Sequence, residues 1–343
     1  MELPSRIAVL VALGEKLRSF DAERDQIIQQ SCIANPWFTP QSVAESIEAI
    51  ASNYLNEQNL RQWLKPYHLP SSPNPPKTIG LVMAGNIPLV GWHDFLCVFI
   101  SGHKAQIKLS GKDSLLFPYL VNLLAQLDPE TRQFISIVEQ LSGFDAIIAT
   151  GSNNSARYFE YYFGKYPHII RKNRSSAAIL SGNETPEDIR ELGKDIFQYF
   201  GMGCRNVSKL FVPVGYDFPN LLHHLEPFAD LLQHNKYKNN YEYYYSIFLL
   251  NGQVKYASDF LVLQENSAVA SPIGVLHYEY YTDTNDLNNK LVEQKEQIQC
   301  VVSSGISSNG TYIPFGNAQQ PQLWDYADGI DTLQFLASLQ QES

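Results

Sequence analysis

Residues 78–111 read TIGLVMAGNIPLVGWHDFLCVFISGHKAQIKLSG and contain two short apolar runs around a longer apolar segment. The short runs, at residues 78–86 and 104–110, have the length and composition of buried strands. Residues 88–102 between them are long enough for a helix and end at a glycine, which commonly follows a helix. A strand, a helix and a strand in this order predict a parallel βαβ unit.

The same alternation continues on both sides of this stretch. Residues 1 to about 70 are expected to form helices, one of which begins at Pro40 with Thr39 as its N-cap. A Pro- and Ser-rich connector follows at 69–77. Downstream we expect, in chain order, a helix over 113–127, strands over 134–139 and 144–152, a helix over 155–165, and strands over 168–172 and 176–182. This order predicts a mostly parallel sheet with helices on both faces, whose ligands bind at the carboxyl ends of the strands.

Polar and glycine residues follow three of the predicted strands. AGN at 84–86 follows the first, KLSGK at 108–112 the second, and TGSNNS at 150–155 a later strand that precedes a helix. The N-terminus of that helix is suited to phosphate. The usual dinucleotide fingerprint G-x-G-x-x-G is absent, and glycine and serine are common in any loop. The three loops together suit a dinucleotide, although each alone is a weak signal.

A further stretch, residues 185–214, places Cys204 on a short connection between a helix and a strand. Thr185 as N-cap and Pro186 at the first helical position open the helix, and two glycines end it. The run KLFVPV that follows has the composition of a strand. A glycine-flanked turn leaves backbone N–H groups free to face a ligand, which is compatible with a catalytic thiol. The alternative is a small buried hydrophobe, the usual role of a free cysteine.

Length, charge and cysteine content limit the class of protein. The chain has 343 residues, 44% of them hydrophobic, which suffices for two domains with sizeable cores. Its net charge of −10 argues against a broad nucleic-acid surface and leaves room for a local basic pocket that binds a phosphorylated ligand. The four cysteines form no C-x-x-C pair and the histidines are scattered, so neither a disulfide framework nor a metal site is expected.

No apolar run reaches the roughly 18 residues of a membrane helix, and the first residues have the pattern of an amphipathic helix rather than a signal peptide. We therefore expect a cytoplasmic protein with no membrane span. Two tyrosine-rich stretches, at 235–252 and 276–286, are expected to be strands packed on a core rather than platforms for stacked bases.

Taken in order over residues 75–320, these motifs resemble the aldehyde dehydrogenase superfamily. Within it they are similar to the acyl-CoA reductases related to the long-chain fatty acyl reductase of bacterial luminescence, the LuxC family. The resemblance implies an α/β fold of two three-layer α/β/α domains with mostly parallel sheets, the first a Rossmann-like cofactor domain. That domain is expected over 1–180, with 306–343 returning to it. A catalytic thiol domain is expected over 181–305, with the active site between the two.

Individual motifs imply site residues by the same resemblance. AGNIPLVG is similar to the loop that contributes a catalytic asparagine, here Asn86, and FGMGCRNVSKLFVP to the segment of the nucleophile, here Cys204. IKLSGKD resembles the loop that binds the adenosine ribose, and TGSNNSA the glycine-serine loop over the cofactor. YIPFGN at 312–317 is similar to a late P-F-G-G segment. The implied cofactor-binding residues are Lys108, Ser110, Gly111, Gly151 and Ser152.

Three departures from the superfamily pattern refine the expected reaction. The general-base glutamate should fall near Arg171, where no carboxylate stands. Aldehyde oxidation needs that base to activate water, whereas acyl transfer to or from a thiol does not. Gly111 replaces a ribose-binding glutamate, with Lys112 beside it, which makes room for a 2′-phosphate and favours NADPH at least as much as NADH. The glutamate for the nicotinamide ribose has no clear counterpart near 267–274.

The expected activity is an NADPH-dependent reduction of an acyl-CoA, or of an acyl-carrier thioester, to the aldehyde through an acyl-enzyme on Cys204. One alternative is an acyltransferase or thioesterase that uses Cys204 without hydride transfer. Another is a non-catalytic nucleotide-binding scaffold. An acyl-donating partner enzyme and a homo-oligomer are both compatible with the sequence.

Several residues also have a plain structural interpretation. Asn86 suits the cap of a helix that begins near Pro88. Lys108 fits an ordinary surface lysine at a strand end. Arg171 and Arg174 are candidates for binding a CoA phosphate or an acyl carrier. Solvated surface charge is the more common role of such side chains.

Overall fold

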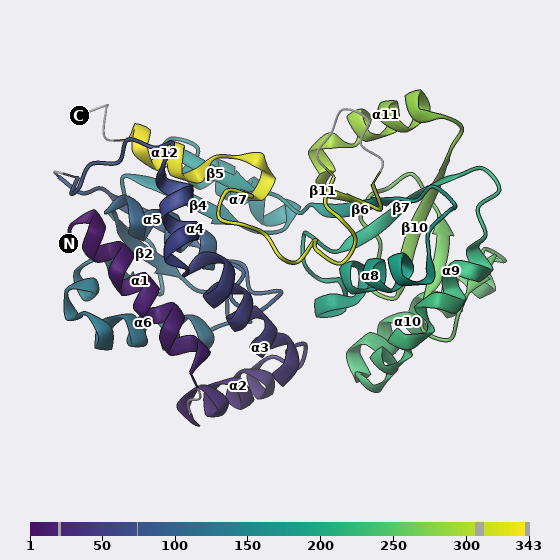
Figure 1. The fold of residues 1–343 in the computed structure, drawn as a ribbon, viewed down its shortest axis with the longest axis horizontal. Helices are drawn as coiled ribbons and strands as arrows, with labels where there is room; N and C mark the ends of the chain where they lie inside the picture. Colours follow the sequence, from purple (N-terminus) through teal and green to yellow (C-terminus); the bar gives the residue numbers. More distant parts are fainter. Residues whose placement is uncertain (20–21, 74, 306–311, 340–343) are drawn as a thin grey trace. The chain divides into compact units, whose positions relative to one another are not determined.

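A computed structural model describes residues 1–19, 22–73, 75–305 and 312–339 (Figure 1). The chain forms two compact units, the first made of Met1–Asn173 and Pro321–Ser343 and the second of Arg174–Gln320. The chain thus leaves the first unit after Asn173 and returns to it at Pro321, whereas the sequence analysis places these two changes at 180 and 306. Residues 306–311 lie outside the described residues.

The N-terminal part of the first unit is helical, as the sequence predicts. Thr39 accepts a hydrogen bond from the Ser42 N–H at 3.1 Å, and Ser42 Oγ lies 3.0 Å from the Thr39 N–H, so a reciprocal capping box starts the helix at Pro40. The helices of this part are α1 (Leu3–Arg18), α2 (Ala22–Ala34), α3 (Pro40–Ala49), the π-helical turn η1 (Ile50–Tyr54) and α4 (Glu57–Leu64). The C-terminal α12 (Thr332–Ser338) contacts α5 (Trp92–Ser101) of the same unit.

The first unit is built on a parallel sheet with strand order β3-β2-β1-β4-β5. Its strands are β1 (Thr78–Val82), β2 (Lys104–Lys108), β3 (Ile135–Ile137), β4 (Ala146–Thr150) and β5 (His168–Arg171), connected by α5 (Trp92–Ser101), α6 (Leu116–Leu127), η2 (Pro129–Gln133) and α7 (Asn153–Phe163). From β1 the chain moves through α5 and α6 in one direction, and from β4 through α7 in the other. Right-handed crossovers therefore place α7 on the opposite face from α5 and α6.

The strand ends of this sheet are in register. Val82, the last residue of β1, pairs with Lys108 of β2 and with Ala149 of β4. The loops after these three strands consequently leave the same edge. The strand order reverses between the paired strands β1 and β4. Ligands of such sheets usually bind at the loops that follow the strands at this position.

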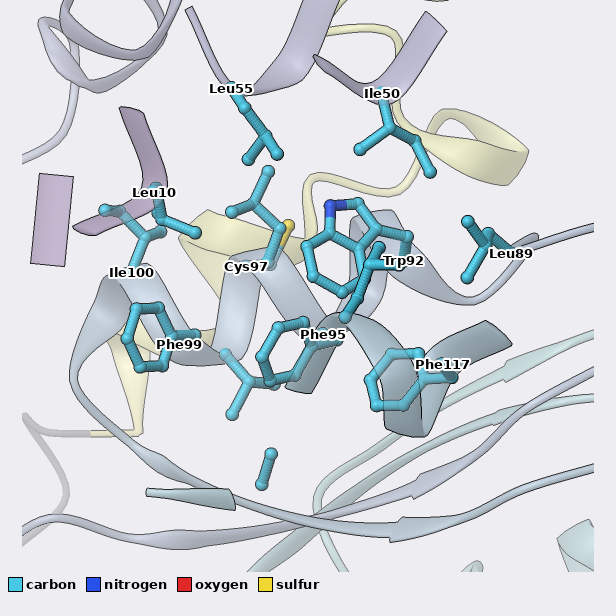
Figure 2. Close-up of a cluster of buried hydrophobic side chains, with 14 of the residues drawn as sticks. Leu10, Ile50, Leu55, Leu89, Trp92, Phe95, Cys97, Phe99, Ile100 and Phe117 are labelled. Carbon is cyan, nitrogen blue, oxygen red and sulfur yellow. The ribbon is translucent and has the colours of Figure 1, made fainter. Parts of the chain in front are cut away.

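Helix α5 is the centre of the hydrophobic core behind this edge (Figure 2). Most of its residues are buried, including Trp92, Phe95 and Phe99 at 1% exposure or less. The Phe95 ring meets the Phe117 ring of α6 edge to face at 5.2 Å. Burying each such side chain contributes about 1.5–3 kcal/mol, so α5 gives the β1 loop a rigid support.

The second unit has six strands in the order β11-β6-β7-β10-β9-β8, all parallel to their neighbours except β8. The chain crosses from β6 to β7 through α8, and from β10 to β11 through α11 in the opposite direction, which places α8 and α11 on opposite faces (Figure 1). The strands are β6 (Ser175–Ile179), β7 (Val207–Pro213), β8 (Tyr256–Ala257), β9 (Val262–Glu265), β10 (Val275–Tyr281) and β11 (Ile298–Ser303). The helices are α8 (Pro186–Phe197), η3 (Gln198–Gly201), α9 (Phe218–Leu225), η4 (Glu226–Gln233), α10 (Asn235–Leu250), α11 (Thr284–Glu293) and η5 (Lys295–Gln297).

The expectation of a strand over 235–252 is wrong, because these residues form helix α10. The His234 side chain caps it by accepting from the Tyr237 N–H at 3.3 Å. Tyr237 and Tyr241, one turn apart, are the buried residues of this helix, and Tyr237 donates to the Phe260 carbonyl oxygen at 3.1 Å. The spacing of four between buried aromatics thus outweighs the strand preference of tyrosine. In the other tyrosine-rich stretch, residues 276–281 belong to strand β10 as predicted, whereas residues 284–286 begin helix α11.

Among the described residues, no helix combines the length and the apolar character that a bilayer crossing requires. Within the same part of the chain, His, Cys, Asp and Glu side chains nowhere gather in a group of three or more that could hold a metal ion.

Candidate functional site

The loops after β1 and β2 pack against each other. A Cβ atom on Gly85 would lie 2.7 Å from the Ser110 side chain, so only glycine permits this approach. Asp113 ties the two loops together, since its Oδ2 accepts from the Leu89 N–H at 2.7 Å and its own N–H donates to the Ser110 carbonyl oxygen at 3.1 Å. Burial raises the pKa of Asp113 to about 6. The structure therefore brings Ser110 and the loop of Asn86 together.

Asn86 lies in the turn between β1 and α5. Helix α5 begins at Trp92 with Gly91 as its N-cap, so Asn86 does not cap it. The turn is fixed at two points, because Ser46 Oγ donates to the Pro88 carbonyl oxygen at 2.9 Å and the Leu89 N–H donates to Asp113 Oδ2 at 2.7 Å. Leu89 itself adopts a positive φ of 56°. A non-glycine residue in that conformation is strained and is retained at sites where the surrounding structure demands it.

The β2 end presents an open surface. Lys108 is exposed, and its Nζ donates to the Glu139 carbonyl oxygen at 2.6 Å. Ser110 Oγ accepts from the Lys112 N–H at 3.2 Å, which turns the loop. A Cβ on Gly111 would meet no atom within 4 Å. There is therefore room beside Lys112 for an anionic group.

The β4 end leads directly into α7. Ser152 is the N-cap, with its Oγ accepting from the Ser155 N–H at 3.2 Å. A Cβ on Gly151 would lie 2.8 Å from Ser155 Cβ and 2.9 Å from the Phe159 ring, so glycine is required for the tight turn. The first turn of a helix of 11 residues offers N–H groups and the positive end of its dipole to a phosphate.

A small pocket, with about 20 Å³ of space for a water-sized molecule, opens between the ends of β1 and β4. Its walls are mainly apolar and include Met83, Val90 and Ile148, and its polar groups come from Thr150 and Asp94. Asp94, on the first turn of α5, is its charged side chain. The pocket thus occupies the position at which the strand order reverses.

Arg171 is neither solvated nor placed as a phosphate ligand, contrary to both interpretations from the sequence. Its side chain is 3% exposed and donates to Asp94 Oδ1 at 2.7 Å, to Thr332 Oγ1 at 2.8 Å and to the Ala327 carbonyl oxygen at 2.6 Å. The sequence could not show this, because the partners lie 77 to 161 residues away. Arg174, in the other unit, is 17% exposed and pairs with Glu296 at 3.5 Å.

Cys204 lies half-buried on the connection between α8 and β7, at the amino end of β7. The residues just before it have unusual backbone conformations. Tyr199, Phe200 and Gly201 are consecutive left-handed residues, with φ of 53°, 58° and 76°. Non-glycine residues in this region cost of order 1 kcal/mol or more each, so the turn that presents Cys204 is strained.

Asn206, which the sequence interpretation missed, holds this turn in place. It is 1% exposed, and its Oδ1 accepts from the Gly203 N–H at 2.7 Å. Its Nδ2 donates to three carbonyl oxygens at the end of α8, those of Gln198, Asp195 and Ile196, at 2.8, 3.1 and 3.3 Å. An asparagine three residues after a glycine turn is the only local signal of such a role.

Removing the Asn206 amide should destabilise the fold. Asn206→Ala leaves a buried N–H and several buried carbonyl groups without their partner, so we expect the free energy of unfolding to fall by about 3 kcal/mol. Urea unfolding measures this change. The exposed Asn220 on α9 provides the matched control, because Asn220→Ala should change stability by less than about 0.5 kcal/mol. Equal effects of the two substitutions would contradict this role of Asn206.

The segment 312–317 and the turn that carries Cys204 are joined within the second unit. Asp195 of α8 is 1% exposed, and its carboxylate accepts from the Gly316 N–H at 2.7 Å and from the Ala318 N–H at 2.9 Å. Arg205, the residue after Cys204, donates to the Ala318 carbonyl oxygen at 3.4 Å. Two of the motifs quoted from the sequence are therefore neighbours in space.

The Asp195 carboxylate should make stability depend on pH. Its burial raises the pKa from 3.8 to about 6, although its two N–H donors oppose the shift. Between these values the folded state binds the extra proton, so raising the pH through this window lowers the free energy of unfolding. Asp195→Asn cannot ionise, and its stability relative to wild type should therefore rise between about pH 4 and pH 7. A pH-independent difference in urea unfolding would count against this assignment.

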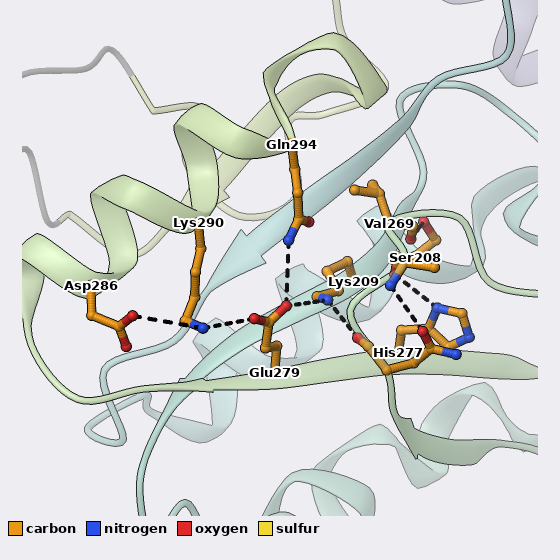
Figure 3. A network of polar contacts seen from close by, with 10 residues as sticks. Ser208, Lys209, Val269, His277, Glu279, Asp286, Lys290 and Gln294 are labelled. Carbon is orange, nitrogen blue, oxygen red and sulfur yellow. Dashed lines mark hydrogen bonds and ion pairs between the residues drawn. The ribbon is translucent and has the colours of Figure 1, made fainter.

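A polar network anchors the segment 266–269 to β7 and β10 (Figure 3). Lys209 Nζ, Ser208 Oγ and the His277 ring donate to the carbonyl oxygens of Asn266, Val269 and Ala268 at 2.5, 2.8 and 2.9 Å. Glu279 lies between the Lys209 and Lys290 ammonium groups, 2.7 Å from each. Burial alone would raise the pKa of Glu279, but the two lysines hold it below its ordinary value. This segment, where a ribose-binding glutamate has no counterpart, is thus fixed beside β7.

A second cysteine has a histidine partner but lacks the properties of a nucleophile. The Cys97 sulfur lies 3.9 Å from Nδ1 of His93, which precedes it by one turn of α5. Cys97 is 0% exposed, and burial raises the pKa of its thiol well above the ordinary value. A thiol that neither ionises nor meets solvent is a packing residue, so this pair does not compete with Cys204.

The sequence matches no family model and no curated protein. Solved structures do match its fold. The putative aldehyde dehydrogenase from Burkholderia cenocepacia is 14% identical over 90% of this chain and 76% of its own, with a TM-score of 0.67. The Mycobacterium tuberculosis aldehyde dehydrogenase complexed with NAD+ is 14% identical over 88% and 73%, with a TM-score of 0.66. An E. coli NADP-dependent enzyme is 11% identical over 90% and 74%, with a TM-score of 0.64. The expected aldehyde dehydrogenase-like α/β fold is confirmed.

Proposed function

We propose that this chain is an NADPH-dependent acyl-CoA reductase that forms an acyl-enzyme on Cys204 and releases an aldehyde. The observation that carries the proposal is the position of Cys204, half-buried on a strained turn at the amino end of β7 in an aldehyde dehydrogenase-like fold. Backbone strain is concentrated at functional sites, and a packing cysteine needs no such turn. The second unit would supply the thiol and the first would bind the cofactor.

In the proposed reaction the Cys204 thiolate attacks the thioester carbonyl carbon, and the CoA thiolate leaves. The side-chain amide of Asn86 and the backbone N–H of Cys204 donate to the oxyanion at each tetrahedral stage. NADPH, when bound, supplies the hydride that reduces the acyl-enzyme. The second tetrahedral species then collapses, the aldehyde leaves, and Cys204 is released as the thiolate, so no general base is needed.

We propose that the loops of the first unit bind the nucleotide. Lys108, with Ser110 and Gly111, would hold the adenosine ribose, and Gly151 with Ser152 would bring the α7 N-terminus to the pyrophosphate. The open space at Gly111 beside Lys112 supports room for a 2′-phosphate, and NADH would also be accepted. Two of the similar structures are described as an NAD+ complex and an NADP-dependent enzyme, which supports a nicotinamide cofactor here.

Aldehyde oxidation is the second candidate, because the structure does bring one carboxylate, Asp94, beside Arg171. A general base has to be within hydrogen-bond reach of the water that it activates. Asp94 instead makes a 2.7 Å ion pair with the buried Arg171 guanidinium, and its Oδ1 is occupied by that contact. Thioester reduction needs no base and is therefore the better supported reaction.

Comparing the two reactions tests the proposal. NADPH consumption is followed with short, medium and long acyl-CoAs, and NAD(P)+ reduction with the matching aldehydes in the absence of CoA. We expect thioester-dependent NADPH consumption and slow or absent oxidation. Faster oxidation of the aldehyde to the acid would overturn the proposal, and CoA release without NADPH consumption would favour an acyltransferase or thioesterase. If CoA esters fail, the same assay with acyl-carrier thioesters examines a partner enzyme as acyl donor.

A further inference from the structure

A buried hydroxyl links the candidate nucleophile to a second thiol. Ser176 of β6 is 0% exposed, and its Oγ lies 3.1 Å from the Cys204 carbonyl oxygen. The same oxygen lies 3.3 Å from the Cys300 N–H nitrogen and 3.0 Å from the Cys300 sulfur. Strand β6 stands between β7, which follows Cys204, and β11, which carries Cys300. All three residues belong to the second unit.

The donors and acceptors around Ser176 determine where its proton points. A hydroxyl has one proton and two acceptor positions. The Cys204 carbonyl oxygen can only accept, so the Ser176 proton goes to it, and the Cys300 N–H donates to one acceptor position. The remaining position takes the Cys300 S–H. Ser176 therefore keeps its bond to Cys204 while Cys300 is a protonated thiol, whereas a Cys300 thiolate would compete for the same proton.

We propose that Ser176 is a positioning residue for Cys204 and that the Cys300 thiol sets the direction of the Ser176 hydroxyl. The inference deepens the proposed function, because it rests on Cys204 as the nucleophile. The Gly203 N–H, which belongs to the 202–203 peptide, donates to Asn206 Oδ1. The Cys204 carbonyl, which belongs to the 204–205 peptide, accepts from Ser176. The 203–204 peptide carries the N–H assigned to the oxyanion and is thus held from both sides.

The experiment compares Ser176→Ala with Ser175→Ala, its neighbour on β6 whose side chain points to the other face. Hydrogen exchange of peptides spanning residues 202–207 should be about tenfold faster in Ser176→Ala and unchanged in the control. Acyl-enzyme formation from acyl-CoA, followed by intact mass, should slow by about tenfold while the dissociation constant for NADPH stays the same. Cys300→Ser retains a donor and should behave as wild type, whereas Cys300→Ala should show a partial effect of the same kind.

The outcomes of these experiments distinguish a failure of this inference from a failure of the proposed function. Exchange in Ser176→Ala equal to that in Ser175→Ala would overturn the positioning role, whether or not the enzyme reduces acyl-CoA. Faster exchange in Ser176→Ala, in a protein that forms no acyl-enzyme even as wild type, would support the positioning role and reject the reductase. If Ser176→Ala does not fold, the Cys300 pair tests the same hydroxyl without altering β6, and indistinguishable Ser and Ala variants would overturn the role of Cys300.

Discussion

Replacing Cys204 with alanine is expected to abolish acyl-CoA-dependent NADPH consumption, with a loss of at least about 10⁴-fold in kcat. Without Cys204, the turn held by Asn206 offers no thiol that can accept the acyl group. NADPH binding, followed by nucleotide fluorescence, should change little, since the loops assigned to the cofactor are in the other unit. Removing a partly exposed sulfur should also leave the free energy of unfolding almost unchanged.

The matched control is Cys32→Ala, another half-buried cysteine, which belongs to α2 in the first unit. Burial raises the pKa of Cys32, so it has no feature of an activated thiol. This variant should retain full activity. A Cys204→Ala enzyme that still reduces acyl-CoA would disprove the covalent route, and one that also fails to bind NADPH would show that Cys204 is structural.

The second large effect is expected for Asn86→Ala, which should lower kcat by about 10²- to 10³-fold. An oxyanion donor acts mainly in the transition state, so KM for the acyl-CoA should change much less than kcat. The turn that holds Asn86 is anchored through Pro88 and Leu89, and the helix after it has its own cap at Gly91. The substitution should therefore leave the fold intact.

Steady-state kinetics with a thermal unfolding control measures this prediction. Asn251, an exposed residue that follows α10, provides the comparison, because Asn251→Ala should leave kcat unchanged. A kcat for Asn86→Ala within twofold of wild type would remove Asn86 from the reaction. A fall in kcat accompanied by a lower unfolding temperature would instead assign it a structural role.

Much of the fold could be predicted because local patterns and burial agree. The run 78–111 forms β1, α5 and β2 as expected, since each segment is buried and its length suits only one element. Thr39 starts α3 and Thr185 starts α8 through capping boxes that short-range chemistry alone determines. The α10 prediction failed because composition favours strands at tyrosine, whereas the spacing of Tyr237 and Tyr241 decides the packing.

The contacts of the residues that support the candidate site could not be predicted from the sequence. Their partners are distant in sequence or belong to the backbone. Asp195 holds the N–H groups of Gly316 and Ala318, more than 120 residues away. Ser176 meets Cys300 at a separation of 124 residues. Arg171 is predicted from the sequence to be a surface charge, whereas in the structure it is buried beside Asp94. Such contacts leave no local pattern, so motifs can indicate a nucleophile but not the groups that hold it.

The covalent step is the central claim, and intact-protein mass spectrometry tests it most directly. The protein is mixed with an acyl-CoA in the absence of NADPH, and the adduct is mapped after proteolysis. The account predicts one acyl group per chain, located on the peptide that contains Cys204, with release of free CoA and loss of the adduct when NADPH is added. No adduct, or an adduct on Cys300 rather than on Cys204, would contradict it.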